Sequence, residues 1–129
     1  MKFLIADDSP LILKETYYEV RKVLGEEADI YLAKSAKEAL KYVGENLSEK
    51  PGEGIQIAFL DVDMPGMDGI EAAEQNRRIS PQTKVVYVTG HTEKEIREMA
   101  GGEEVIVLMK PVFKRDLCEV FEKIGFPAS

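Results

Sequence analysis

Four short apolar runs recur along the chain, and none of them alternates with polar residues. Each is four or five residues long and consists mostly of β-branched, aromatic or other large apolar side chains. The runs are residues 3–6 (FLIA), 57–60 (IAFL), 85–88 (VVYV) and 105–109 (VIVLM). Uninterrupted runs of this length are typical of strands that helices cover on both faces. A weaker fifth run, residues 30–33 (IYLA), predicts an edge strand.

Helix signals lie between the runs. Ser9 and Pro10 provide an N-cap and a first-turn proline, and apolar residues then follow at helical spacing up to Gly25. Reciprocal capping boxes are predicted at the start of the second and fourth helices. They pair Ser35 with Glu38 and Thr92 with Glu95. A third helix is predicted from residues 68–69 to 78, and a last helix around residues 117–124.

Strands that alternate with helices five times predict a parallel sheet with helices on both faces. Because crossovers between parallel strands are right-handed, few topologies remain. We predict an α/β fold of the flavodoxin-like, doubly wound (βα)5 type, with strand order 2-1-3-4-5. The polar stretch 46–54 (NLSEKPGEG) is expected to be a surface loop. Residues 1–129 are expected to form one domain, and this length fits either a complete protein or a piece of a longer one with an output domain.

Charge and composition exclude several functions. The formal net charge is −7 and the sequence pI is about 4.8, which argues against direct binding to nucleic acid or to an anionic membrane surface. The sequence contains no stretch of roughly 20 apolar residues that would span a membrane. Cys118 is the single cysteine, so an internal disulfide is impossible and a cytoplasmic location is expected.

Polar side chains follow the predicted strands where each strand ends. Asp7 and Asp8 follow the first strand, Asp61 the third, Thr89 the fourth and Lys110 the fifth. Ligands of such sheets bind at the carboxyl ends of the strands, near the point where the strand order reverses. We therefore expect these five side chains to share one edge of the sheet.

Three carboxylates at one edge require a counter-charge. Two unit charges ~4 Å apart repel by about 4 kcal/mol at an effective dielectric constant of ~20, so the cluster favours a bound cation or a proton. Oxygen ligands suit Mg²⁺, and Lys110 could hold an anion beside it. A metal, a lysine and a hydroxyl around Asp61 indicate a phosphoryl-transfer site in which this carboxylate is the nucleophile.

Each residue also has a simpler interpretation when it is taken alone. Asp8 or Ser9 could only cap the first helix, and Lys110 could be a solvated lysine. The turn MPGMDG could only introduce a helix, and His91 is expected in a surface loop. The conjunction of all five side chains at strand ends is what favours a functional site.

The motifs resemble those of the receiver domain of bacterial two-component response regulators. The resemblance extends from about residue 2 to residue 124, and its most specific parts are Asp7-Asp8-Ser9, LDVDMPGMDGIEA around Asp61, Val88-Thr89-Gly90 and Lys110-Pro111. It implies a signalling phosphoacceptor that catalyses only its own phosphorylation and dephosphorylation. The donor would be the phosphohistidine of a sensor histidine kinase or a histidine phosphotransfer protein.

The resemblance also implies a role for each matching position. Asp61 would be phosphorylated, and Asp7, Asp8 and Asp61 would hold Mg²⁺ together with the backbone carbonyl of Asp63. Lys110 would contact the phosphoryl oxygens, and the peptide bond from Lys110 to Pro111 would be cis. Thr89 would move towards the phosphoryl group. Asp63 and His91 would flank the path of the water that hydrolyses the aspartyl phosphate.

One departure from the family pattern concerns the output. The family usually has Tyr or Phe three positions before the lysine, where this chain has Val107. A stiff β-branched side chain cannot act as a rotating lever. The downstream output protein or domain, or a phosphorylation-dependent dimer, is still expected to use the surface of the fourth helix, fifth strand and last helix, with weaker coupling to the phosphoryl group.

Two other classes of protein fit some of the same residues. Asp61-Val62-Asp63 resembles the nucleophile motif of haloacid-dehalogenase-like phosphatases, although in those enzymes it lies near the N-terminus of a longer chain. Alternatively, the chain could be an interaction module that signals without phosphate. Multiple turnover on a generic phosphate ester would favour the first class, and the absence of Mg²⁺-dependent phosphorylation would favour the second.

Overall fold

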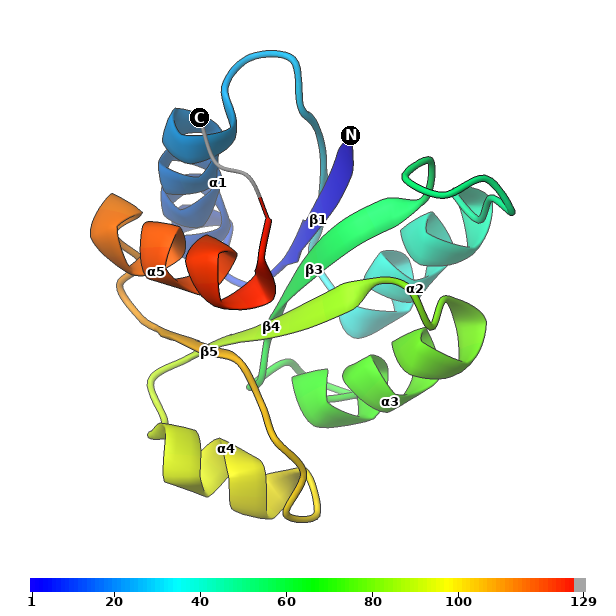
Figure 1. Cartoon of the computed structure of the whole chain (residues 1–129). Helices are drawn as coiled ribbons and strands as arrows, with labels where there is room; N and C mark the ends of the chain where they lie inside the picture. The colour runs from blue at the N-terminus through cyan, green and yellow to red at the C-terminus, as the bar shows by residue number, and fades with distance from the viewer. Residues whose placement is uncertain (127–129) are drawn as a thin grey trace.

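The computed structural model describes residues 1–126, so the last three residues of the predicted 1–129 domain lie outside the described part. A central sheet of five parallel strands has the order β2-β1-β3-β4-β5 (Figure 1). The strands are β1 (Lys2–Ala6), β2 (Asp29–Ala33), β3 (Ile55–Asp61), β4 (Lys84–Thr89) and β5 (Val107–Met109). The helices are α1 (Pro10–Leu24), α2 (Ala36–Glu45), α3 (Gly69–Ile79), α4 (Glu93–Met99) and α5 (Lys114–Ile124). The predicted flavodoxin-like fold and strand order are confirmed, and β2 is an edge strand as expected.

The helices divide into two layers, one on each face of the sheet (Figure 1). One core includes Phe3, Phe59 and Phe121 and joins the sheet to α1 and α5. The other includes Leu60, Tyr87 and Ile96 and joins the sheet to α2, α3 and α4. β3 contributes side chains to both cores, which explains why its sequence is apolar without alternation. No helix in residues 1–126 is long and apolar enough to cross a membrane.

Most of the predicted helix starts are confirmed. The hydroxyl of Ser9 caps α1, and Thr92 and Glu95 form a reciprocal capping box at the start of α4. The capping box predicted at the start of α2 is only half formed. The hydroxyl of Ser35 accepts a hydrogen bond from the Glu38 N–H, but the Glu38 carboxylate accepts from the N–H of Lys34, one residue earlier than expected.

The fifth strand is shorter than the sequence predicts. The apolar run covers residues 105–109, whereas β5 contains only residues 107–109. The chain reaches β5 through Gly101 and Gly102, which both have positive φ angles. Pairing with β4 starts at the carbonyl of Ile106, which accepts a hydrogen bond from the Tyr87 N–H at 2.9 Å. The segment between α4 and β5 therefore uses part of the apolar run to return to the sheet.

Candidate functional site

The carboxyl ends of β1 and β3 place two buried carboxylates side by side. Asp61 is the last residue of β3 and Asp7 directly follows β1, and their exposed fractions are 1% and 2%. The register pairs Ala6 with Leu60, so the two aspartates follow paired residues. The N–H of Ser9 donates to Asp7 Oδ1 at 2.9 Å, and the N–H of Asp63 donates to Asp61 Oδ1 at 3.2 Å.

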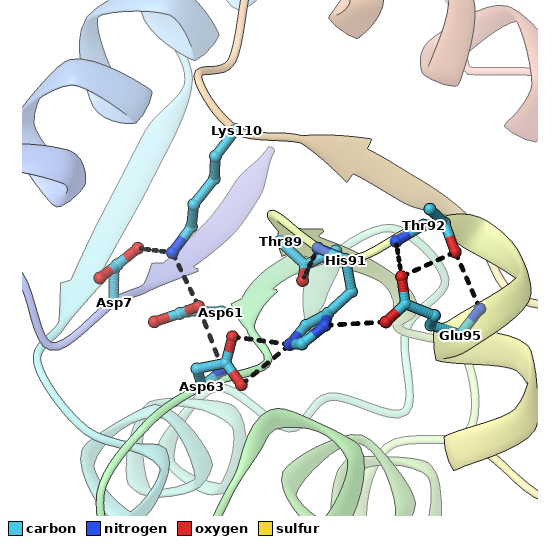
Figure 2. Close-up of polar contacts among 8 residues, drawn as sticks. All are labelled: Asp7, Asp61, Asp63, Thr89, His91, Thr92, Glu95 and Lys110. Atoms are coloured by element: carbon cyan, nitrogen blue, oxygen red, sulfur yellow. Dashed lines mark hydrogen bonds and ion pairs between the residues drawn. The ribbon is translucent and has the colours of Figure 1, made fainter.

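Lys110 reaches both carboxylates from the end of β5. Its Nζ lies 2.8 Å from Asp61 Oδ1 and 3.1 Å from Asp7 Oδ2 (Figure 2). The N–H of Lys110 donates to the Thr89 carbonyl at 2.8 Å, which fixes the main chain at the end of β5. The peptide bond from Lys110 to Pro111 is cis, as the family resemblance implied. The ammonium is therefore a partner of two buried charges, and the interpretation of Lys110 as a solvated lysine is wrong.

The buried charges perturb one another. Burial raises the pKa of the Asp61 carboxyl, and the nearby Asp7 charge raises it further, although the Lys110 ammonium opposes both effects. Burial alone would lower the pKa of Lys110, but its hydrogen bonds to Asp61 and Asp7 outweigh burial and raise it. The site thus favours the charged form of Lys110 and disfavours the charged form of Asp61.

The exposed Asp8 completes a group of oxygen donors. One carboxylate oxygen each from Asp7, Asp8 and Asp61 lies within 4.8 Å of the other two. Three hard oxygen donors and an excess of negative charge suit Mg²⁺. The predicted donor residues therefore fit the metal that the family implies.

Asp63 and His91 form a contact with each other that the sequence motifs did not predict. His91 Nε2 lies 3.1 and 3.2 Å from the two carboxylate oxygens of Asp63, and Nδ1 lies 3.4 Å from Glu95 (Figure 2). The hydrogen bond with Asp63 is the main reason that the pKa of His91 is raised. The Asp63 side chain is 66% exposed and engaged with His91, which leaves its backbone carbonyl as the predicted metal ligand.

Thr89 lies at the end of β4 next to this contact, whereas Val107 is the first residue of β5. Thr89 is fully buried, and its Oγ1 accepts a hydrogen bond from the His91 N–H at 2.9 Å. Val107 pairs with Tyr87 in the β4–β5 register, so the two side chains point to the same face of the sheet. A buried tyrosine thus lies on the strand beside the position where the family usually has an aromatic residue.

The largest-volume hollow described for the protein is not lined by Asp7, Asp8 or Asp61. This hollow of about 630 Å³ lies at the opposite edge of the sheet, beside the loops that precede β3 and β4. Leu47, Pro51 and Pro81 are among its lining residues. The hollow is far from the carboxylates, because those residues lie near the amino ends of the strands.

Comparisons with known proteins agree with this arrangement. Residues 3–122 match the family model described as "Response regulator receiver domain". The chain is 32% identical over 127 residues to the positive alginate biosynthesis regulatory protein of Pseudomonas aeruginosa, covering 98% of this chain and 48% of that protein. It is 33% identical over 81 residues to the response regulator receiver protein CpdR of Brucella abortus, covering 62% of this chain and 65% of that protein. The chain therefore spans about half to two thirds of the length of these two relatives.

Solved structures show the same architecture. A response regulator receiver domain protein from Clostridium thermocellum superposes with a TM-score of 0.76 at 25% identity, over 95% of this chain and 91% of that one. A CheY-like receiver domain protein from Methanospirillum hungatei gives a TM-score of 0.71 at 28% identity, over the same shares of the two chains. Together with the family match over most of its length, these similarities show that the chain belongs to the receiver domain family of two-component response regulators.

Proposed function

We propose that the chain is a signalling phosphoacceptor that takes a phosphoryl group onto Asp61 from a phosphohistidine, with the help of Mg²⁺. The observation that carries this proposal is the position of Lys110 Nζ, 2.8 Å from Asp61 Oδ1, beside a group of three carboxylates. A nucleophile, a fixed cation and a set of metal donors are what in-line phosphoryl transfer to a carboxylate requires.

In the proposed reaction, the free carboxylate oxygen of Asp61 attacks the phosphorus of the donor. The P–N bond to the donor imidazole breaks, and its electron pair remains on the imidazole nitrogen. Lys110 moves its hydrogen bonds from Asp61 to the transferred phosphoryl oxygens. Asp7, Asp8, Asp61 and the Asp63 carbonyl would hold Mg²⁺, which supplies further neutralisation of the phosphoryl charge.

The aspartyl phosphate would then be sensed and hydrolysed at the same edge of the sheet. We assign Thr89 to donate its O–H to the phosphoryl group, and its Oγ1 accepts a hydrogen bond from the His91 N–H in this structure. We assign Asp63 and His91 to control the access of the hydrolytic water, since both lie on loops that flank Asp61.

The partners follow from this chemistry. We propose a sensor histidine kinase or a histidine phosphotransfer protein as the donor. A downstream output protein or domain, or a second phosphorylated copy, would bind according to the phosphorylation state of the domain.

The expected location is the cytoplasm, because the single cysteine offers no internal disulfide.

Intact mass spectrometry tests the proposal. Incubating the protein with a small phosphodonor such as acetyl phosphate should add one phosphoryl group in the presence of Mg²⁺ and none in the presence of a chelator. Asp61→Asn should abolish the addition. The matched control Asp68→Asn should retain it, because Asp68 caps α3 and asparagine also caps helices.

Two outcomes would contradict the assignment. Labelling that survives Asp61→Asn would place the acceptor elsewhere. A wild-type protein that binds its partner but is never labelled, even by a phosphohistidine protein, would instead support the interaction module that signals without phosphate.

A further inference from the structure

Gly69, the first residue of α3, packs against the main chain of Asp61. A Cβ atom built on Gly69 would lie 2.3 Å from the Asp61 carbonyl oxygen and 2.8 Å from the Val62 Cα. Real Cβ atoms essentially never approach other atoms closer than 3.0 Å. Any side chain at position 69 would therefore force the Asp61–Val62 peptide and the start of α3 apart by about 0.7 Å or more.

Space, and not backbone conformation, is what requires glycine here. The glycines with positive φ in residues 1–126 include Gly66, in the same loop, but not Gly69. Around Gly66, a Cβ would meet no atom within 4 Å. Glycine is also a poor helix former, so helix propensity does not explain its place in α3. The close approach to Asp61 is the remaining physical reason.

Two features hold Gly69 close to the main chain of Asp61. The N–H of Gly69 donates to the Val62 carbonyl at 2.9 Å, which closes the loop between β3 and α3. One helical turn further on, the buried face of α3 carries the small residues Ala72 and Ala73, which are fully buried and let the helix lie close to the sheet. α3 cannot tilt away at its start without breaking this hydrogen bond.

The loop between β3 and α3 also contains Asp63, which contacts both Asp61 and His91. The N–H of Asp63 donates to Asp61 Oδ1 at 3.2 Å, and the Asp63 carboxylate contacts His91. A shift of the Asp61–Val62 peptide would move the nucleophile relative to Lys110 and Asp7. It would also move the Asp63 carbonyl, the proposed fourth metal ligand.

We propose that Gly69 is a positioning residue for phosphoryl transfer: the missing side chain lets α3 fix the main chain of Asp61 and Asp63 at the metal and phosphoryl site. This inference rests on the proposed phosphoacceptor function. It assigns no chemical step to Gly69, which acts only through the placement of Asp61 and the Asp63 carbonyl.

The test is Gly69→Ala, compared with a control that weakens the same helix start without touching Asp61. Asp68 Oδ1 accepts a hydrogen bond from the Glu71 N–H at 2.9 Å, so Asp68→Ala removes the N-cap of α3. Both variants should lower the melting temperature. If Gly69→Ala does not fold by itself, the same substitution is made in a Gly44→Ala background that stabilises the protein. Gly44 lies in α2, where alanine is the better helix former, and a Cβ there meets no atom within 4 Å.

Three measurements are made on the folded proteins at one temperature: Mg²⁺ affinity by titration, the rate of labelling by acetyl phosphate, and the amide NMR shifts without metal. A misplacement of about 1 Å can cost roughly 100-fold in rate, so we expect Gly69→Ala to lose roughly that much labelling rate and to bind Mg²⁺ several-fold more weakly. Its amide shifts should change most at residues 59–63. Asp68→Ala should match wild type in labelling rate and Mg²⁺ affinity.

The outcomes separate this inference from the proposed function. If Gly69→Ala labels and binds Mg²⁺ as Asp68→Ala does, Gly69 has only a structural role and the inference is wrong. If wild type itself is not labelled, the proposed function fails, and the Mg²⁺ affinities and amide shifts still decide whether Gly69 positions Asp61.

Discussion

The ammonium of Lys110 lies 2.8 Å from Oδ1 of Asp61, although the two residues are 49 positions apart in the sequence. They lie at the ends of β5 and β3, with β4 between these strands in the sheet. The lysine side chain therefore reaches across the end of a neighbouring strand to its partner. Because Lys110 also contacts Asp7, this one cation links the ends of three strands.

Replacing Lys110 with Met should destabilise the protein at neutral pH without Mg²⁺. The change leaves Asp7 and Asp61 buried without their cation. Breaking a buried ion pair costs ~3–5 kcal/mol, and we expect about 2 kcal/mol because Lys110 is partly exposed. Urea denaturation measures the loss. Lys22→Met, which removes a surface pair with Glu19, is the control, and a loss no greater than in this control would contradict the prediction.

The stability of the metal-free protein should depend on the ionisation of Asp61. Its pKa is raised by burial and by Asp7, so the folded state penalises the charged form. As the pH rises from below the ordinary Asp value of about 3.8 through the raised folded-state pKa, wild type should lose stability relative to Asp61→Asn. Urea unfolding of both proteins across this range checks the sign. Parallel curves would show that Asp61 is not penalised.

Mg²⁺ binding should depend on Asp8 although this side chain is exposed. Asp8 contributes one of three carboxylate oxygens that lie within 4.8 Å of one another. Asp8→Ala should therefore weaken Mg²⁺ binding at least tenfold. The rise in melting temperature that Mg²⁺ produces should shrink with it, because a ligand that binds the folded state more weakly stabilises it less at the same concentration. Equal Mg²⁺ titrations of Asp8→Ala and wild type would remove Asp8 from the metal site.

His91 should stabilise the protein more at low pH than at high pH. Its pKa is raised, mainly by the hydrogen bond to Asp63. The stabilisation is fully present below the unfolded-state pKa of about 6.5 and is lost as the pH rises through the folded-state pKa. The difference in unfolding free energy between wild type and His91→Gln should therefore shrink above neutral pH. The same difference measured in an Asp63→Asn background should depend less on pH, and an unchanged dependence would assign the effect to another group.

Val107→Tyr should strengthen the coupling between the phosphoryl group and the output surface. Val107 is stiff and short, so one contact that could differ between the two states is missing, and a ligand shifts an equilibrium only through such differences. Partner affinity or self-association is measured with and without a beryllofluoride phosphoryl mimic. The added tyrosine would lie beside Tyr87 of β4. Coupling that stays equal or falls in the variant would show that the missing aromatic does not limit the switch.

Much of the fold could be read from the order of local patterns. Apolar runs without alternation predicted buried parallel strands, and the caps at Ser9 and Thr92 marked helix starts correctly. These signals are local, because backbone hydrogen bonding and capping depend on residues three or four positions apart. Local signals failed where a competing partner was available. Glu38 bonds the N–H of Lys34 instead of completing a capping box, and β5 begins only at Val107 because the chain must first return from α4.

The sequence by itself determined which residues stand at the ends of the strands, and the right-handed crossovers of a parallel sheet then brought Asp7, Asp8, Asp61 and Lys110 to one edge. Only the tertiary structure decided which of these side chains meet. It paired Lys110 with Asp61 and Asp7, turned the Asp63 carboxylate to His91, and placed α3 so close to Asp61 that position 69 has no room for a side chain. The physical reason is that such contacts depend on distances of a few tenths of an ångström between segments far apart in the chain, and these distances are set by how the whole core packs.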